Sequence, residues 1–195
     1  MKILQNTTAW IVAAMVLLMA ATRFNHFGSA AALPDASYAA FFLGGLYLGR
    51  MRGGWAIFAL LLLEAALVDY YAISFQGVSG WCVTEAYAFL MLAYALLWSA
   101  GRWYAPRHNL SGKSLSGLSA TAVAAVSLAF VIANVSFYLL AGYFGSMGVA
   151  EYAGRAAQYF GSYVAVAMMY IGCAVVVQMV YAILTGKAGR NTKPV

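Results

Sequence analysis

Six long apolar stretches take up most of this 195-residue chain, and they restrict its fold more than any other feature. The stretches lie near 6–23, 33–50, 53–74, 81–100, 118–142 and 156–185. A helix needs roughly 20 apolar residues to cross the hydrocarbon core of a bilayer. Only 8% of the residues are charged, whereas soluble domains carry about 25%. The sequence therefore predicts an all-α integral membrane protein with six transmembrane helices.

The connections between the stretches are too short to fold on their own, so residues 1–195 are expected to form a single domain. The second stretch is the least regular, because Leu33-Pro34-Asp35 interrupts its beginning. Proline suits the first position of a helix, and a carboxylate is stabilised near a helix N-terminus. Residues 1–21 also have the pattern of a signal peptide, but no clear A-x-A cleavage site follows, and we expect them to be retained.

The few charged residues are divided between the two sides of the predicted membrane. Nine of the eleven basic residues lie in the N-terminus, two alternate connections and the C-terminal tail. They are Lys2, Arg50, Arg52, Arg102, Arg107, Lys113, Lys187, Arg190 and Lys193. Arg23 and Arg155 lie in the opposite connections, and all five acids lie there or within the stretches. By the positive-inside rule the first set, and both termini, are cytoplasmic. The net charge of +6 then reflects orientation and contact with anionic lipid, and not nucleic-acid binding.

Three carboxyl groups are expected within or beside the third and fourth spans. Glu64 lies near the middle of span three, Asp69 about one and a half turns further out, and Glu85 one turn inside span four. An ionised carboxylate at the bilayer centre costs on the order of 3 kcal/mol, so such groups usually face a polar interior. Glu64 is either a protonated or hydrogen-bonded group that joins two helices, or a proton-coupling residue. Asp69, nearer the outer face, is a candidate for ligand binding.

Cys82 and Cys173 are too far apart in sequence to form a C-x-x-C motif, and we expect no disulfide between them. Cys173, midway along an apolar run, is expected to be a packing residue. Cys82 follows Gly80-Trp81 at the outer end of span four. It is either a small packing residue or, where a nearby arginine favours the thiolate, a ligand for a soft metal.

His26 and Arg155 are the remaining polar candidates on the outer side. His26 and His108 fall on opposite sides of the membrane, which argues against a bis-histidine haem or a zinc site. His26 is then a ligand, a hydrogen-bond donor or an interface residue. Arg155 either binds an anionic or amide group or pairs with Glu151 one turn earlier.

Known catalytic motifs are missing from the sequence. We find no G-x-S-x-G elbow, Walker motif, H-E-x-x-H sequence or dinucleotide-binding fingerprint. The chain is therefore not expected to hydrolyse a nucleotide or to be an enzyme of these classes.

Three segments together resemble one transporter family. They are Arg23-Phe24-Asn25-His26-Phe27-Gly28-Ser29, Leu33-Pro34-Asp35-Ala36-Ser37 with Phe41-Phe42, and Gly80-Trp81-Cys82. They look like the BtuM family of small cobalamin transporters, which are related to the S-components of energy-coupling-factor (ECF) vitamin transporters. The resemblance covers residues 6–185 and implies an ECF S-component-like fold in the bacterial inner membrane.

The resemblance also implies roles for individual residues. Cys82 would be the axial ligand of the cobalt of cobalamin, and the other residues of the corrinoid pocket would be His26, Asp69, Tyr87 and Arg155. Ala9 and Ala13 match the Ala-x-x-x-Ala pattern through which S-components dock on a coupling module, although BtuM-like proteins are often solitary. Cys82 and Tyr87 are five residues apart, roughly 140° around a helix, so they face one ligand only if Cys82 precedes the regular helix or the ligand is broad.

We therefore expect a transporter that captures cobalamin at the periplasmic face and delivers it to the cytoplasm. A thiolate donates strongly to cobalt, so binding of cyanocobalamin is expected to promote loss of cyanide. Three alternatives remain open: an S-component-like transporter of another vitamin recognised by Glu85 and Arg155, a membrane thiol or redox protein that acts at Cys82, and a purely structural membrane subunit. The energy source also remains open.

Overall fold

The computed structural model describes residues 2–23 and 33–186 of the chain, and these residues are almost entirely helical. The described part contains six α-helices: α1 (Lys2–Thr22), α2 (Ser37–Leu48), α3 (Gly54–Phe75), α4 (Tyr87–Tyr104), α5 (Gly112–Leu140) and α6 (Val149–Leu184). Two short 3-10 helices, η2 (Gly80–Cys82) and η3 (Ala105–Arg107), flank α4. The predicted all-α fold with six helices is confirmed.

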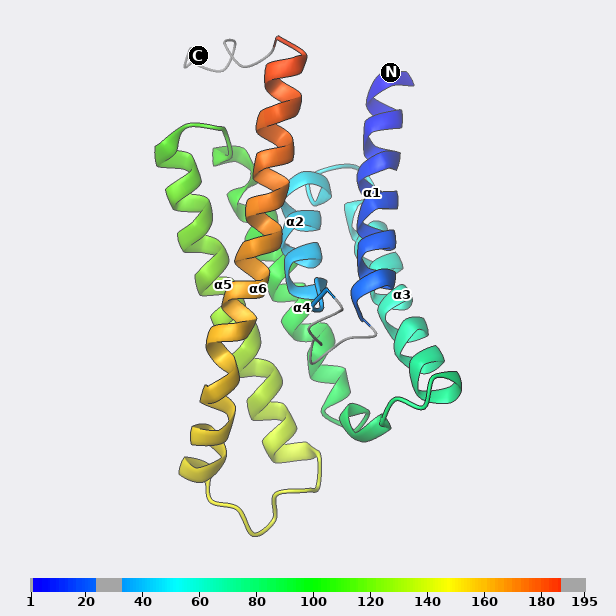
Figure 1. The fold of residues 1–195 in the computed structure, drawn as a ribbon, viewed down its shortest axis with the longest axis vertical. Coiled ribbons are helices and arrows are strands. Elements are labelled where there is room, and N and C mark those ends of the chain that lie inside the picture. The colour runs from blue at the N-terminus through cyan, green and yellow to red at the C-terminus, as the bar shows by residue number, and fades with distance from the viewer. Residues whose placement is uncertain (1, 24–32, 187–195) are drawn as a thin grey trace.

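Successive helices run in opposite directions along one bundle (Figure 1). The start of α1, the 49–53 and 105–111 connections and the end of α6 lie at one end, which we call the basic end because it carries most of the Lys and Arg residues. The 76–86 and 141–148 connections lie at the opposite end, which we call the Cys82 end. The sequence-based division of charge thus corresponds to the two ends of the molecule.

Helices α3, α5 and α6 are long and apolar enough to cross a membrane. Many large apolar side chains on these helices are exposed, as is typical of surfaces that face lipid. By contrast, α2 has 12 residues and a length of about 18 Å, which is short of the roughly 30 Å of a hydrocarbon core. The structure therefore supports a helical membrane protein with three evident spanning helices.

Five of the six helices begin four or more residues from their predicted starts; α1 starts at Lys2 and not at 6, and α5 at Gly112 and not at 118. Helix α2 starts at Ser37 and not near 33, because Pro34 precedes it and the Asp35 carboxylate accepts a hydrogen bond from the Ser37 amide at 2.9 Å. Helix α4 starts at Tyr87 and not at 81, because a 3-10 turn and an irregular segment come first. Helix α6 starts at residue 149, seven residues before the predicted span at 156, so the loop before it is shorter than expected.

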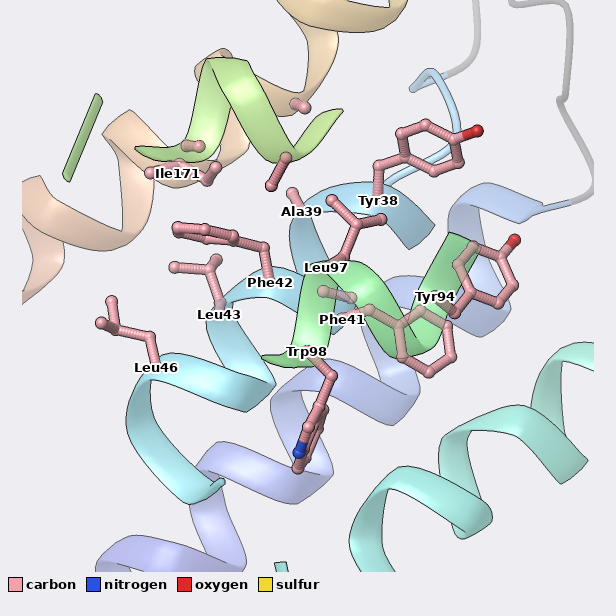
Figure 2. Close-up of a cluster of buried hydrophobic side chains, with 14 of the residues drawn as sticks. Tyr38, Ala39, Phe41, Phe42, Leu43, Leu46, Tyr94, Leu97, Trp98 and Ile171 are labelled. Carbon is pink, nitrogen blue, oxygen red and sulfur yellow. The ribbon is translucent and has the colours of Figure 1, made fainter. Parts of the chain in front are cut away.

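Helix α2 forms the centre of the bundle. Eleven of its 12 residues are buried, and it packs on α4, α6, α1 and α3. The ring of Phe41 stacks on that of Tyr94 from α4 with 4.2 Å between centroids, and Trp98 lies one turn further along α4 (Figure 2). This apolar contact fixes the position of α2 relative to α4.

Glycines allow the backbones of α2 and α4 to approach closely. A Cβ atom on Gly45 would collide with the carbonyl group of Trp98, and one on Gly101 would collide with the carbonyl group of Phe42. Small residues at helix contacts are typical of membrane proteins, where close packing replaces the hydrophobic driving force between helices. The α2–α4 contact therefore depends on the absence of side chains at these two positions.

Candidate functional site

Cys82 is the last residue of the short helix η2, and it is exposed. The Ser79 hydroxyl begins this turn by accepting a hydrogen bond from the Trp81 amide at 3.3 Å. Regular helix starts only at Tyr87, so Cys82 precedes it. The condition under which Cys82 and Tyr87 can face one ligand is therefore met.

The side chain of Trp81 packs the η2 turn against the 141–148 connection and the end of α5. Its ring stacks on Tyr143 with centroids 5.6 Å apart and meets Phe137 edge-on at 4.8 Å. Phe137 belongs to the last turn of α5, and Tyr143 follows that helix. The contact joins the 76–86 and 141–148 connections next to Cys82 and thereby fixes the position of the thiol.

Arg23, directly after α1, is the centre of a buried polar network. Its Nε and Nη2 atoms donate to the two carboxylate oxygens of Asp69 on α3, each at 2.7 Å. Its Nη1 atom donates to Ser37 Oγ and to Tyr94 Oη, each at 2.8 Å. The Arg23 side chain is 0% exposed and that of Asp69 11% exposed. A buried charge is tolerated when it is paired and its hydrogen bonds are satisfied.

The network reaches α2 and α4 through further hydrogen bonds. Tyr87, the first residue of α4, donates its hydroxyl to Asp69 Oδ2 at 2.6 Å. Ser37, the first residue of α2, donates its hydroxyl to Asp35 Oδ1 at 2.6 Å. Arg23 and residues of α2, α3 and α4 thus form one polar cluster. Of the predicted site residues, the structure brings Asp69 and Tyr87 into direct contact.

Cys82 lies close enough to Asp69 to interact with it electrostatically. Partial burial of the thiol and the negative charge of Asp69 raise the pKa of Cys82 above its ordinary value. This is opposite to the influence of the arginine anticipated from the sequence. The thiol is therefore protonated near neutral pH in the ligand-free protein, and metal ligation must displace its proton.

Arg155 is placed away from this network. It lies in the second turn of α6, where its Nη2 atom is 2.8 Å from Glu151 Oε1. The two side chains are 63% and 55% exposed, which identifies a surface ion pair of the i,i+4 type. The structure thus shows the pairing with Glu151 that was one of the two interpretations of Arg155. His26, the remaining predicted site residue, lies outside the described residues.

Two further expectations from the sequence are wrong. Glu85 is exposed and precedes α4, so it is not one turn inside a span. Cys173 is exposed on α6 and is not a buried packing residue. Both cysteines are free, as expected. Glu85 therefore adds nothing to the buried network, and Cys82 is the thiol that lies next to it.

The site also contains three residues that were not predicted from the sequence, Arg23, Ser37 and Tyr94. One signal for Arg23 was available, since it is one of only two basic residues outside the set predicted to be cytoplasmic, and Asp69 was an acid without an assigned partner. Ser37 and Tyr94 carried no comparable signal, because isolated hydroxyl groups are common in membrane helices. Tyr163 on α6 is a further neighbour, close enough to interact electrostatically with Cys82.

An apolar groove elsewhere in the bundle has no part in this cluster. It has a volume of about 820 Å³ and lies between α4 and α5, with an almost entirely apolar lining from Leu92 to Trp103 and from Ala120 to Leu128. None of its lining residues belongs to the predicted site. The polar cluster near Cys82 is therefore the stronger candidate for a specific site.

Comparisons with known proteins do not identify the chain. No protein-family model matches it, and no curated protein matches it at a significant level. The candidate site is accordingly defined by its own geometry: a free thiol in a short turn beside a buried arginine–aspartate pair and the tyrosine bound to that pair.

Proposed function

We propose that this protein is a bacterial inner-membrane transporter that takes up cobalamin, with Cys82 as the axial ligand of the corrinoid cobalt. The observation that carries the proposal is the position of the free Cys82 thiol, which is exposed, precedes α4 and lies beside the Asp69–Tyr87 pair. Sulfur is a ligand suited to soft metal centres. Hydroxyl and carboxylate groups nearby are suited to the amide-bearing edge of a corrinoid.

The ligation step requires the loss of one proton from Cys82. The thiol proton leaves to solvent, and the thiolate occupies the axial position of the cobalt in place of the benzimidazole base of the vitamin. Strong donation from sulfur weakens the bond to the ligand on the opposite face, so bound cyanocobalamin should release cyanide. His26 and Arg155 complete the proposed set of binding residues from the outer loop and from α6.

The distribution of charge supports an orientation with the basic end in the cytoplasm. The start of α1 and the end of α6 both lie at this end, together with Arg102 in the last turn of α4 and the two connections that hold Arg50, Arg52 and Arg107. Short loops rich in Lys and Arg remain on the cytoplasmic side. Cys82 would then face the periplasm, where the substrate arrives, and the chain would cross the membrane six times with both termini inside.

A partner for energy coupling would meet α1. Ala9 and Ala13 are exposed and lie one turn apart, so they present small side chains on the outside of the bundle. This surface is suited to close approach of another helix. We propose it as the contact for an ECF-type coupling module, if the protein uses one; the lipid bilayer and cobalamin are the other partners.

One observation favours an alternative function, the transport of a vitamin other than cobalamin. Arg23, Asp69 and Tyr87 form a polar network whose hydrogen bonds do not involve Cys82. A small polar substrate could be recognised by this network alone, with Cys82 uninvolved. This alternative predicts that replacement of Cys82 leaves substrate binding intact, whereas cobalt ligation predicts that it does not.

The test is an absorption spectrum of the purified protein after incubation with cyanocobalamin and removal of unbound ligand. The wild type should retain a corrinoid with shifted bands, Cys82→Ala should lose the shift, and Cys173→Ala, the matched control at the other free thiol, should behave as the wild type. Retention of corrinoid with an unshifted spectrum would disprove thiolate ligation. Failure of the wild type to retain any corrinoid would disprove cobalamin as the substrate, and a thiol that turns over without metal would favour a redox protein.

A further inference from the structure

Glu64 is a carboxyl group in the middle of α3 that no hydrogen bond satisfies. Both of its oxygens are inaccessible to solvent, and neither has a hydrogen-bond partner among the residues that the structure describes. Helix α3 is one of the three helices apolar enough to cross a membrane. Ionised groups in such segments are costly, and they are retained where they have a function. Without a donor, the carboxyl group is stable only in its neutral, protonated form.

The surroundings of Glu64 are apolar except near Arg23. The carboxyl group lines a cavity of about 310 Å³ between α1 and α3, together with Ala20 of α1 and Tyr71 of α3. The backbone of Ala20 lies beside the carboxyl group, but its amide belongs to the hydrogen bonding of helix α1. Helices α1 and α3 lie side by side in Figure 1. Apart from Glu64 and Tyr71, the cavity is therefore lined by aliphatic residues.

Arg23 is the cation whose charge acts on Glu64. It comes three residues after Ala20, which lines the cavity, and it pairs with Asp69, which comes five residues after Glu64 on α3. In the structure Arg23 is engaged by Asp69 of α3, Ser37 of α2 and Tyr94 of α4. Glu64 and Asp69 lie five residues apart on α3, and Arg23 acts on Glu64 through its charge and on Asp69 through direct hydrogen bonds.

We infer that Glu64 is a proton-binding site whose occupancy is linked to the Arg23–Asp69 ion pair. While Asp69 neutralises the charge of Arg23, Glu64 holds a proton; when Arg23 loses this counter-ion, its positive charge favours the ionised form of Glu64. The linkage is reciprocal, so any event that separates Arg23 from Asp69 favours proton release. This inference rests on the proposed function, and it connects the substrate site to the proton gradient because Asp69 interacts electrostatically with Cys82.

Labelling with N,N′-dicyclohexylcarbodiimide tests the proton site on the full-length protein in detergent micelles, without any corrinoid. The protonated carboxyl group adds across a C=N bond of the reagent, its proton passes to nitrogen, and the acylisourea rearranges to an N-acylurea that retains the whole reagent. We expect one adduct, mapped by mass spectrometry to Glu64 and absent in Glu64→Gln. The exposed Glu85 and Glu151 are internal controls and should remain unlabelled at neutral pH.

The linkage is tested by the rate of labelling. Asp69→Asn should slow the labelling of Glu64 by about tenfold, within the usual range for coupled sites, because the released Arg23 stabilises the ionised form. Labelling at the wild-type rate in this variant would overturn the linkage. In the wild type the rate of labelling should fall as the pH rises. A missing adduct or a pH-independent rate in the wild type would show that Glu64 is not a proton-binding site.

A transport assay separates this inference from the proposed function. In proteoliposomes, Glu64→Gln should retain the corrinoid spectrum of the wild type but lose the dependence of uptake on an imposed pH gradient. Unchanged dependence on the gradient would contradict a role in coupling. If the wild type retains no corrinoid while Glu64 is still labelled in a pH-dependent way, the proposed substrate is wrong and the proton site stands.

Discussion

Loss of the Asp69 charge is expected to destabilise the fold far more than loss of an exposed charge. Asp69→Asn keeps the shape of the side chain but leaves Arg23, whose side chain is 0% exposed, without its bidentate counter-ion. Removal of one partner of a buried pair costs about 3–5 kcal/mol. For a chain of this size 1 kcal/mol changes Tm by about 2–4 °C, so Tm should fall by roughly 6–20 °C.

The measurement is thermal unfolding in detergent micelles, followed by circular dichroism. The double variant Arg23→Met/Asp69→Asn should be more stable than Asp69→Asn alone, because no uncompensated charge remains. Glu151→Gln is the matched control, since it breaks an exposed i,i+4 pair and should cost only a few tenths of a kcal/mol. A double variant that is as unstable as the sum of the two single variants would refute the argument that the buried charge is the cause. Addition of Glu64→Gln to Asp69→Asn should lower Tm further, because it removes the second acid available to Arg23.

Three further predictions concern the Cys82 thiol, the contact between α2 and α4, and the η2 turn. The pKa of the Cys82 thiol is raised, and ligation releases its proton. Corrinoid affinity should therefore increase by about tenfold per pH unit between about pH 6 and 8. A pH-independent Kd, measured by absorption titration, would contradict thiolate ligation. Gly101→Ala should cost about 1–3 kcal/mol or prevent folding, because its Cβ atom would meet the backbone of α2, whereas Gly145→Ala, with open space around it, should be nearly neutral in the same unfolding assay. Trp81→Ala removes the ring stacking on Tyr143 and should increase the rate at which a maleimide alkylates Cys82. An unchanged rate would show that other contacts hold the η2 turn.

The number of helices follows from apolar length, but the positions of their ends do not. Hydropathy treats Trp81 and Cys82 as a continuation of α4, because both side chains are apolar enough for a membrane segment. The break depends on a 3-10 turn and on the cap formed by Ser79, which are local hydrogen-bonding features. Pro34 did signal the irregular start of α2, since it cannot donate a backbone hydrogen bond.

The end of the bundle at which the site lies could be predicted from the sequence, but the contacts among the site residues could not. Charge placement indicated that Asp69 and Arg23 lie toward the same end, but their contact joins residues 46 positions apart and depends on how α1 and α3 are rotated. Rotation is poorly encoded in a membrane helix, because lipid and protein interior are both apolar. The same ambiguity explains why Cys173, within an apolar run, was expected to be buried although it is exposed on α6.

The enclosure of α2 has a consequence for how the chain enters a membrane. A segment of 12 residues, with a length of about 18 Å, is too short to be retained in the bilayer as an independent helix. Its first residue, Ser37, is hydrogen-bonded to Asp35 and to Arg23, and these charges would be unshielded before the neighbouring helices arrive. Assembly from individually stable helices is therefore excluded for this segment. We expect α2 to reach its final depth only when its neighbouring helices have closed around it, so the candidate site and the packed position of α2 are formed together.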